Sequence, residues 1–125
     1  MMAEVNRASC LILNSGKILL VKDKKVKCWS LPGGAVATDE TEEDIAAKNT
    51  EEKTGIPARI IQLFGIYEYQ KEGKNYAENV FEADIPEDKN EEAKPHPDFE
   101  AKWFDVSSAK KKDVCPELKL VFEDI

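Results

Sequence analysis

The sequence is poor in the residues that stabilise disulfide-rich or zinc-binding domains. Its three cysteines, Cys10, Cys28 and Cys115, are an odd number without C-x-x-C spacing. We therefore predict neither a disulfide framework nor a zinc site, and we expect Cys115 to carry a buried, unreactive thiol. The single histidine, His96, lies between two prolines and is expected to be exposed and without a role. This composition favours a reduced, cytoplasmic protein.

Long hydrophobic runs and an excess of positive charge are also missing. No apolar run approaches the roughly 20 residues that cross a bilayer as a helix. The 18 Lys and Arg against 25 Asp and Glu give a net charge of −7, which repels polyanions, so we expect no binding to long nucleic acids or to membranes. A length of 125 residues with 42% hydrophobic content predicts one core and a single domain, residues 1–125.

Strand-like and helix-like segments alternate along the chain, which is typical of mixed α/β proteins. A capping box begins at Thr41 and Gly55 is a stop signal, so we predict a helix from Glu42 to Thr54. Pro32-Gly33-Gly34 predicts a sharp turn or loop. The other expected elements are strands at 8–13 and 17–22 forming a hairpin, a second hairpin at 60–69 and 75–85, a surface loop at 86–98, a strand at 99–106, and a helical tail after Ser107-Ser108.

The stretch from Gly34 to Ile56 has the spacing of a known catalytic box. It begins with Gly34, reaches Glu40 after five residues, and closes with Gly55-Ile56, and Trp29-Ser-Leu-Pro-Gly-Gly leads into it. In this respect the chain resembles the Nudix (MutT-like) hydrolase family, whose box runs Gly, five residues, Glu, seven residues, then Arg-Glu-apolar-x-Glu-Glu-x-Gly-apolar. The resemblance implies an α/β/α sandwich with a mixed β-sheet, and metal-dependent hydrolysis of a nucleoside diphosphate linked to another group.

Inside the box, the residues that carry the chemistry differ from the family pattern. The family's three helical glutamates correspond here to Asn49, Glu52 and Lys53, which share one helix face because they are three and four residues apart. Their formal charges sum to zero where the family pattern gives −3. Since a hard cation such as Mg²⁺ prefers carboxylate oxygens, we expect Mg²⁺ or Mn²⁺ to bind weakly or not at all.

The resemblance carries the following roles over to this chain. The expected metal ligands are the Gly33 carbonyl, Glu40 and Glu52; the expected substrate contacts are Gly33, Gly34, Lys48 and Lys53; and the expected catalytic residues are Glu52 and Glu100. Lys53 is a special case, because a fixed ammonium could contact a diphosphate where a metal would otherwise sit. Glu52 could alternatively pair with Lys48 on the helix, and Asp98 is the other candidate for the general base.

Two functions stay open at this point. One is weak or atypical hydrolysis of a nucleoside diphosphate derivative. The other is a catalytically inactive domain that binds a nucleotide, another diphosphate ligand or a protein partner through the same cleft, with Lys53 and Lys48 on the phosphates. The substrate and the oligomeric state are not encoded in the box.

Overall fold

The structure is a computed structural model that describes residues 3–86 and 92–125. Its elements, in chain order, are β1 (Val5–Asn14), β2 (Lys17–Asp23), β3 (Gly33–Ala35), α1 (Glu42–Thr54), β4 (Arg59–Lys71), β5 (Lys74–Asp84), β6 (Phe99–Asp105), α2 (Val106–Ala109) and α3 (Pro116–Phe122). The helix predicted from Glu42 to Thr54 and both predicted hairpins are confirmed. In the described part of the chain, no helix has the length and apolar character to cross a membrane.

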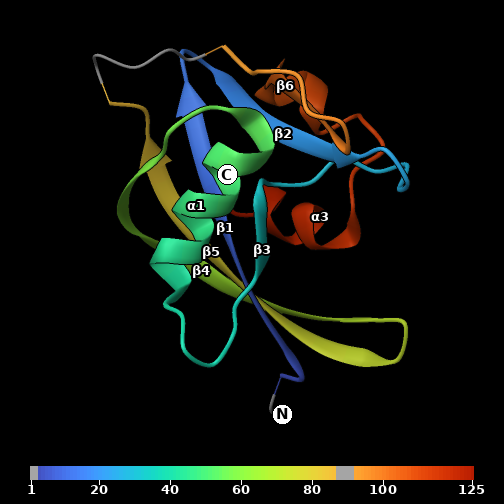
Figure 1. The fold of residues 1–125 in the computed structure, drawn as a ribbon. Coiled ribbons are helices and arrows are strands. Elements are labelled where there is room, and N and C mark those ends of the chain that lie inside the picture. The colour runs from blue at the N-terminus through green and yellow to red at the C-terminus, as the bar shows by residue number, and fades with distance from the viewer. Residues whose placement is uncertain (1–2, 87–91) are drawn as a thin grey trace.

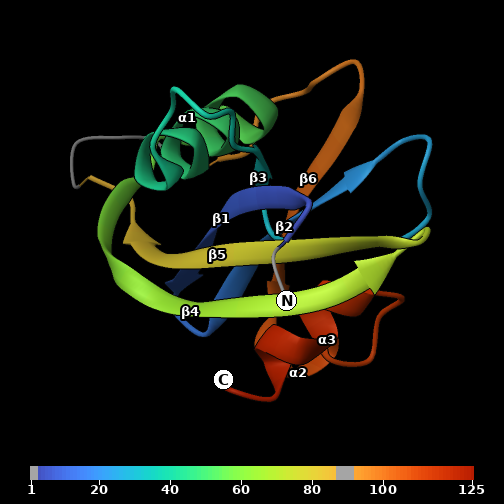
Figure 2. The same cartoon turned by 90° about the horizontal axis from the view of Figure 1, so that it is seen from below.

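The strands form one mixed sheet between two helical layers. Its order is β4-β5-β1-β2-β6, with β3 paired to β1. The β1–β5 pair is parallel and the other ladders are antiparallel. Figures 1 and 2 show α1 on one face of the sheet and α2 with α3 on the other. This arrangement confirms the predicted α/β/α sandwich.

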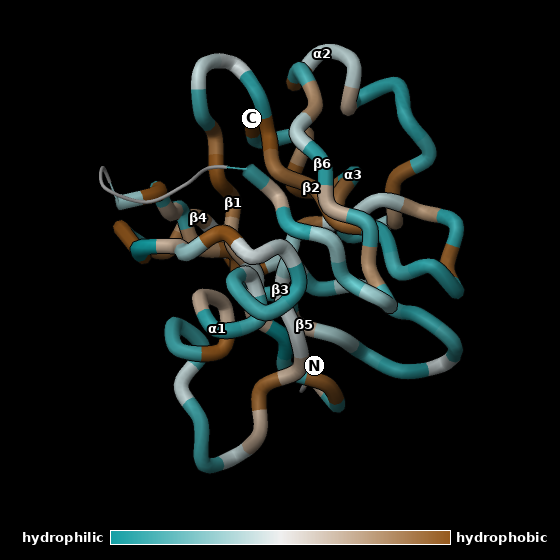
Figure 3. Tube along the Cα trace, turned by 45° about the horizontal axis from the view of Figure 1, so that its top comes forward, coloured by the Kyte–Doolittle hydropathy of each residue, from teal (hydrophilic) through white to brown (hydrophobic). Residues whose placement is uncertain are grey.

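The side chains of β1 point alternately into two separate hydrophobic cores. Ala8, Cys10 and Ile12 belong to the cluster that packs with α1, whereas Leu11 belongs to the cluster that packs with α3. Successive strand residues point to opposite faces, so Arg7 and Ser9 share the α3 face with Leu11. Figure 3 shows hydrophobic stretches in central strands such as β1 and β2 and hydrophilic stretches in the connections.

Helix α1 begins and ends where its capping residues require. The Thr41 side chain accepts a hydrogen bond from Asp44 N at 3.3 Å, and Gly55 adopts a left-handed conformation with φ 76° that donates its N–H to Glu51 O. The helix buries two threonines on the sheet. Thr50 donates its hydroxyl to Ala46 O at 2.8 Å, which satisfies a polar group at a position where the family carries an apolar residue.

The prediction of a loop at Gly33-Gly34 is wrong, because these residues form β3 and pair with β1. Gly34 lies opposite Ala8 and Gly33 opposite Ser9. A Cβ on Gly33 would overlap the Ala8 carbonyl oxygen and come within 2.6 Å of the Ser9 Cβ. Glycine is therefore needed here for the close approach of two backbones, and not for a turn.

Two further predictions need correction at the C-terminal end. Helix α2 contains Ser107 and Ser108, and a non-helical segment separates it from α3, so the tail is not one continuous helix. Cys115 is not a free thiol, since it forms a disulfide with Cys28 across 87 residues of sequence. Cys10 is buried and free. Of the predicted loop at 86–98, residues 87–91 lie outside the described residues.

Candidate functional site

A cleft of about 250 Å³ opens where β1 and β3 meet the loop after β2. Its lining includes Arg7, Gly33, Lys53, Tyr69, Phe99 and Glu117. These residues come from six different elements, so only the tertiary structure brings them together. Two of them, Gly33 and Lys53, belong to the set expected from the box.

The Lys53 ammonium is fixed inside this cleft. It donates a hydrogen bond to the Gly33 carbonyl oxygen at 2.5 Å and lies 4.6 Å from the centre of the Phe99 ring. Burial, and then the positive charge of Arg7, lower the pKa of Lys53. An ammonium held in this way is a preformed contact for an anion, because part of its hydration is already lost.

Arg7 places a second cation in the same cleft, and the sequence analysis missed it. Its Nε donates to Glu78 Oε1 at 3.0 Å, and Tyr69 donates its hydroxyl to the same oxygen at 3.2 Å. The nearby Glu78 charge, opposing the effect of burial, raises the pKa of Arg7. Within the described residues, the terminal nitrogens of Arg7 have no protein partner. Arg7 precedes the strand predicted at 8–13, although β1 begins at Val5, so no sequence signal pointed to it.

The other charged residues of the box lie outside the cleft. Glu40 accepts a hydrogen bond from Ala37 N at 3.0 Å, and Lys48 and Glu52 are exposed on α1. The ion pairs of the described residues join Arg7 to Glu78, Lys22 to Glu100 and Arg59 to Asp84. Neither Glu40 nor Glu52 is thus paired with Lys48 in the described structure. The roles of Glu40, Lys48 and Glu52 remain predictions.

Asn49 occupies the place of the family's first helical glutamate, close to Gly34. Its amide donates to Ile45 O at 3.1 Å, one turn back along α1. A Cβ on Gly34 would lie 2.8 Å from the Asn49 side-chain oxygen. The glycine therefore leaves room for the Asn49 side chain, and no substrate contact is needed to explain it.

Glu100 lies in a neighbouring hollow and not in the cleft. It lines this hollow together with Lys22, Lys24 and His96, and it is 3.5 Å from the Lys22 ammonium. Its carboxylate is about half exposed, at 49%. The structure thus does not bring Glu100 next to Lys53, and its role as general base remains a prediction.

The residues present do not fit the divalent cation that the resemblance implies at α1. The Gly33 carbonyl already accepts the Lys53 ammonium, and two of the three expected carboxylates are absent. In the ranges 3–86 and 92–125, no three His, Cys, Asp or Glu side chains are grouped so that they could hold a metal. The positively charged Lys53 ammonium lies where the box would require a carboxylate ligand for the metal ion.

Comparisons with known proteins agree with the architecture. A family model described as "NUDIX domain" matches residues 4–125. The chain is 42% identical over 65 residues to a putative 8-oxo-dGTP diphosphatase of Bacillus subtilis, covering 51% of this chain and 44% of that protein. It is 37% identical over 60 residues to an ADP-ribose pyrophosphatase of Methanocaldococcus jannaschii, covering 46% and 36%. The matches span less than half of either relative.

Solved structures match over nearly the whole chain. A MutT NUDIX hydrolase from Burkholderia pseudomallei superposes with a TM-score of 0.83 at 23% identity, covering 97% of both chains. A UDP-X diphosphatase gives 0.78 at 20% identity, covering 98% of this chain and 60% of that one. At such identities the likeness shows the fold alone. Together with the family match over residues 4–125, it establishes that this chain belongs to the Nudix family.

Proposed function

We propose that this chain binds a nucleoside diphosphate derivative in the cleft, with the diphosphate on Lys53 and Arg7. The proposal rests on the Lys53 ammonium, which donates a hydrogen bond to the Gly33 carbonyl oxygen at 2.5 Å and lies in the same cleft as Arg7. The relatives named above are described by their action on 8-oxo-dGTP and ADP-ribose, which supports a nucleotide ligand for this chain.

Both cations keep donors for a ligand. An ammonium has three N–H groups and a guanidinium five; Lys53 uses one on Gly33 and Arg7 uses its Nε on Glu78. Charge-assisted hydrogen bonds to phosphate oxygens are strong and, for arginine, often bidentate. A net charge of −7 on the whole chain disfavours long polyanions, so the proposed ligand is a small molecule.

Binding would be tested by titrating the protein with ADP-ribose, UDP-glucose and dGTP in the presence of EDTA. We expect saturable binding by the wild-type protein, and a loss of about tenfold or more in affinity for Lys53→Met, since one charge-assisted hydrogen bond contributes about 1.5 to 3 kcal/mol. Lys119→Met, at an exposed position of α3, is the matched control. Unchanged affinity in Lys53→Met would refute the proposal.

A second candidate is weak metal-dependent hydrolysis. Nudix hydrolases generally use divalent metal ions, and the relatives named above are diphosphatases. Glu52 is the family carboxylate retained on α1, and Glu40, Gly33 and Glu100 are the other residues expected to take part. Release of nucleoside monophosphate only on addition of Mg²⁺ or Mn²⁺, and its loss in Glu52→Gln, would favour this candidate over binding alone.

A further inference from the structure

Tyr69 and Tyr76 form an aromatic pair in the wall of the cleft. They lie directly opposite each other in the β4–β5 ladder, and their rings are stacked, with centroids 5.2 Å apart and an interplanar angle of 11°. Both residues line the cleft. The Tyr69 hydroxyl donates a hydrogen bond to Glu78 Oε1 at 3.2 Å. This contact and the stacking hold the pair in a fixed position.

The order of the strands shows which of the two rings is turned toward the cations. Strand β5 lies between β4 and β1, as Figure 2 shows. Residues that are directly opposite in a ladder point to the same face of the sheet, and Val5 of β1 is the partner of Tyr76. Tyr69 covers the Tyr76 ring from the β4 side. The other face of the Tyr76 ring is therefore turned toward β1.

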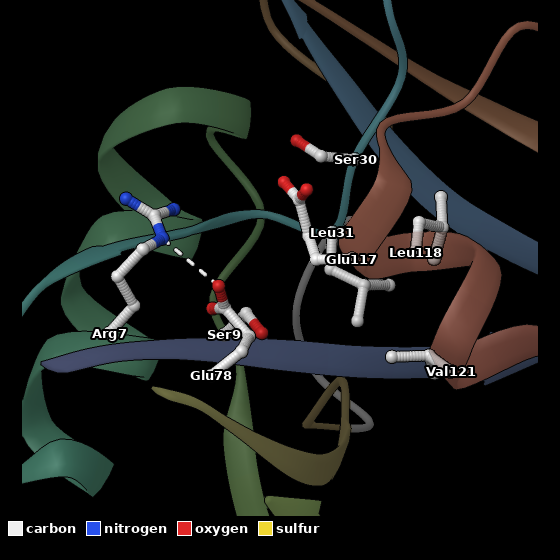
Figure 4. Close-up of a pocket in the computed structure, with 8 residues that line it drawn as sticks. All are labelled: Arg7, Ser9, Ser30, Leu31, Glu78, Glu117, Leu118 and Val121. Atoms are coloured by element: carbon white, nitrogen blue, oxygen red, sulfur yellow. Dashed lines mark hydrogen bonds and ion pairs between the residues drawn. The ribbon is translucent and has the colours of Figure 1, made fainter. Parts of the chain in front are cut away.

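Arg7 lies two residues beyond Val5 on the same face of the sheet. With strands about 4.8 Å apart and a rise of about 3.3 Å per residue, its Cα is about 8 Å from that of Tyr76. On the α3 side, a cavity beside Arg7 and Glu78 has a volume of about 10 Å³, which is enough for about one water molecule. Figure 4 shows this cavity with the Arg7–Glu78 ion pair and Glu117 around it. A group attached to a bound diphosphate has more room toward Tyr76.

The other aromatic ring that lines the cleft is already in use. Of the described residues that line the cleft, Tyr69, Tyr76 and Phe99 are aromatic. The Lys53 ammonium lies 4.6 Å from the centre of the Phe99 ring, and the His96 ring packs against the same ring at 5.2 Å. Since Tyr69 is stacked on Tyr76, the β1-facing side of Tyr76 is the aromatic surface best placed for a ligand.

We propose that a planar nucleobase of the ligand stacks on this face of Tyr76. The inference rests on the proposed function and adds to it the position of the base. A flat π-face suits a planar ring, and stacking of a base on an aromatic side chain is among the strong contacts that proteins make with nucleotides. Because Tyr69 already holds the Tyr76 ring, little side-chain freedom is lost when the base binds.

The test compares a ligand that has a base with one that has none. The protein is titrated with ADP-ribose and, separately, with inorganic pyrophosphate, both in the presence of EDTA. We expect Tyr76→Leu to weaken ADP-ribose binding by about fivefold or more, since it removes one base–aromatic contact, and to leave pyrophosphate binding unchanged. Tyr76→Phe is the matched control, because it keeps the ring and should bind ADP-ribose as the wild type does.

Proton NMR of bound ADP-ribose provides a readout that a mere loss of stability would not produce. The adenine protons should shift upfield when they lie over the ring face, and this shift should persist in Tyr76→Phe and disappear in Tyr76→Leu. The inference is wrong if Tyr76→Leu binds ADP-ribose as tightly as the wild type, or if it loses affinity for both ligands alike. It is equally wrong if the wild type binds pyrophosphate and not ADP-ribose.

Lys53→Met separates the inference from the proposed function. Both ligands carry a diphosphate, so this variant should weaken both. ADP-ribose binding that is insensitive to Lys53→Met and reduced in Tyr76→Leu would contradict the placement of the diphosphate and leave the stacking supported. A wild-type protein that binds neither ligand would rule out the proposed function and the inference together.

Discussion

Lys53 donates its ammonium to the carbonyl oxygen of Gly33 at 2.5 Å, across 20 residues of sequence. The family pattern has a glutamate at the position of Lys53. The resemblance also makes the Gly33 carbonyl a ligand of the metal. The contact therefore turns a pair of expected metal ligands into an internal hydrogen bond. It also fixes a positive charge at the floor of the cleft.

Restoring the box acids should restore a metal site at α1. We expect the double variant Asn49→Glu with Lys53→Glu to bind Mg²⁺ or Mn²⁺ at α1 and to gain metal-dependent pyrophosphatase activity. Positions 49, 52 and 53 would then carry three carboxylates on one helix face, and the Gly33 carbonyl would be freed. The measurement is nucleoside monophosphate release from ADP-ribose and dGTP with and without Mn²⁺. Lys53→Met is the control, since it frees the carbonyl without adding a ligand. A double variant that stays inactive would show that more than charge has been lost.

The affinity for an anionic ligand should depend on pH through Lys53. Burial and Arg7 lower the pKa of Lys53 from 10.5, and the charged ammonium is the form that binds phosphate. Affinity should thus be full below the folded pKa and fall as the pH rises through it, at lower pH than for an ordinary lysine. Ligand titration from pH 7 upward checks this. Lys53→Arg, which keeps its charge throughout, should remove the decline.

The lowered pKa of Lys53 also makes the free energy of unfolding depend on pH. This free energy should rise with pH, whereas the affinity for the ligand should fall. Between the folded pKa and 10.5 the unfolded chain binds more protons at Lys53 than the folded chain does. The free energy of unfolding therefore gains from rising pH in that window. Urea unfolding at several alkaline pH values should show this gain in the wild-type protein and not in Lys53→Met. An equal pH response in both proteins would contradict the assignment to Lys53.

Gly33 should tolerate no side chain. An added Cβ would overlap the Ala8 carbonyl oxygen and approach the Ser9 Cα to 2.7 Å, and both strands are held in place by their ladder. We expect Gly33→Ala to lower the free energy of unfolding by about 1 to 3 kcal/mol or more. Gly73→Asn is the comparison, because Gly73 has open space around it and a φ of 78° that asparagine accepts. Equal stability of the two variants would argue against the close approach.

Reduction of the Cys28–Cys115 disulfide should destabilise the fold. The bond closes a loop across 87 residues of sequence, for which the chain-entropy model gives about 4 to 5 kcal/mol. Thermal unfolding with and without dithiothreitol measures the effect. The double variant Cys28→Ser with Cys115→Ser should be as unstable as the reduced wild type and insensitive to dithiothreitol. A wild-type protein that does not respond to the reductant would show that the bond does not form.

Local signals in the sequence were enough to predict most of the helices and strands. The capping residue Thr41 and the stop at Gly55 set the bounds of α1 correctly, because caps act within one turn of the helix. Turn residues between apolar runs located both hairpins. The loop predicted at Gly33 was wrong because glycine is also used where two backbones approach, and sequence gives no sign of which neighbour is near.

The candidate site was only partly accessible from the sequence. The box identified Lys53 and Gly33, since the spacing of the box fixes both positions. Arg7, Glu78 and Glu117 were not identified, because they lie on three elements that meet through the β1–β5 ladder and the packing of α3. The disulfide was missed for the same reason.

The sequence by itself determined the helix of the box, the hairpins and the loss of negative charge at positions 49, 52 and 53, because each depends on residues close together in the chain. Only the tertiary structure decided where the remaining charges meet. Sheet register and helix packing place Arg7 beside Glu78 and bring Glu117 to the same cavity, and these are contacts between residues that are far apart in sequence.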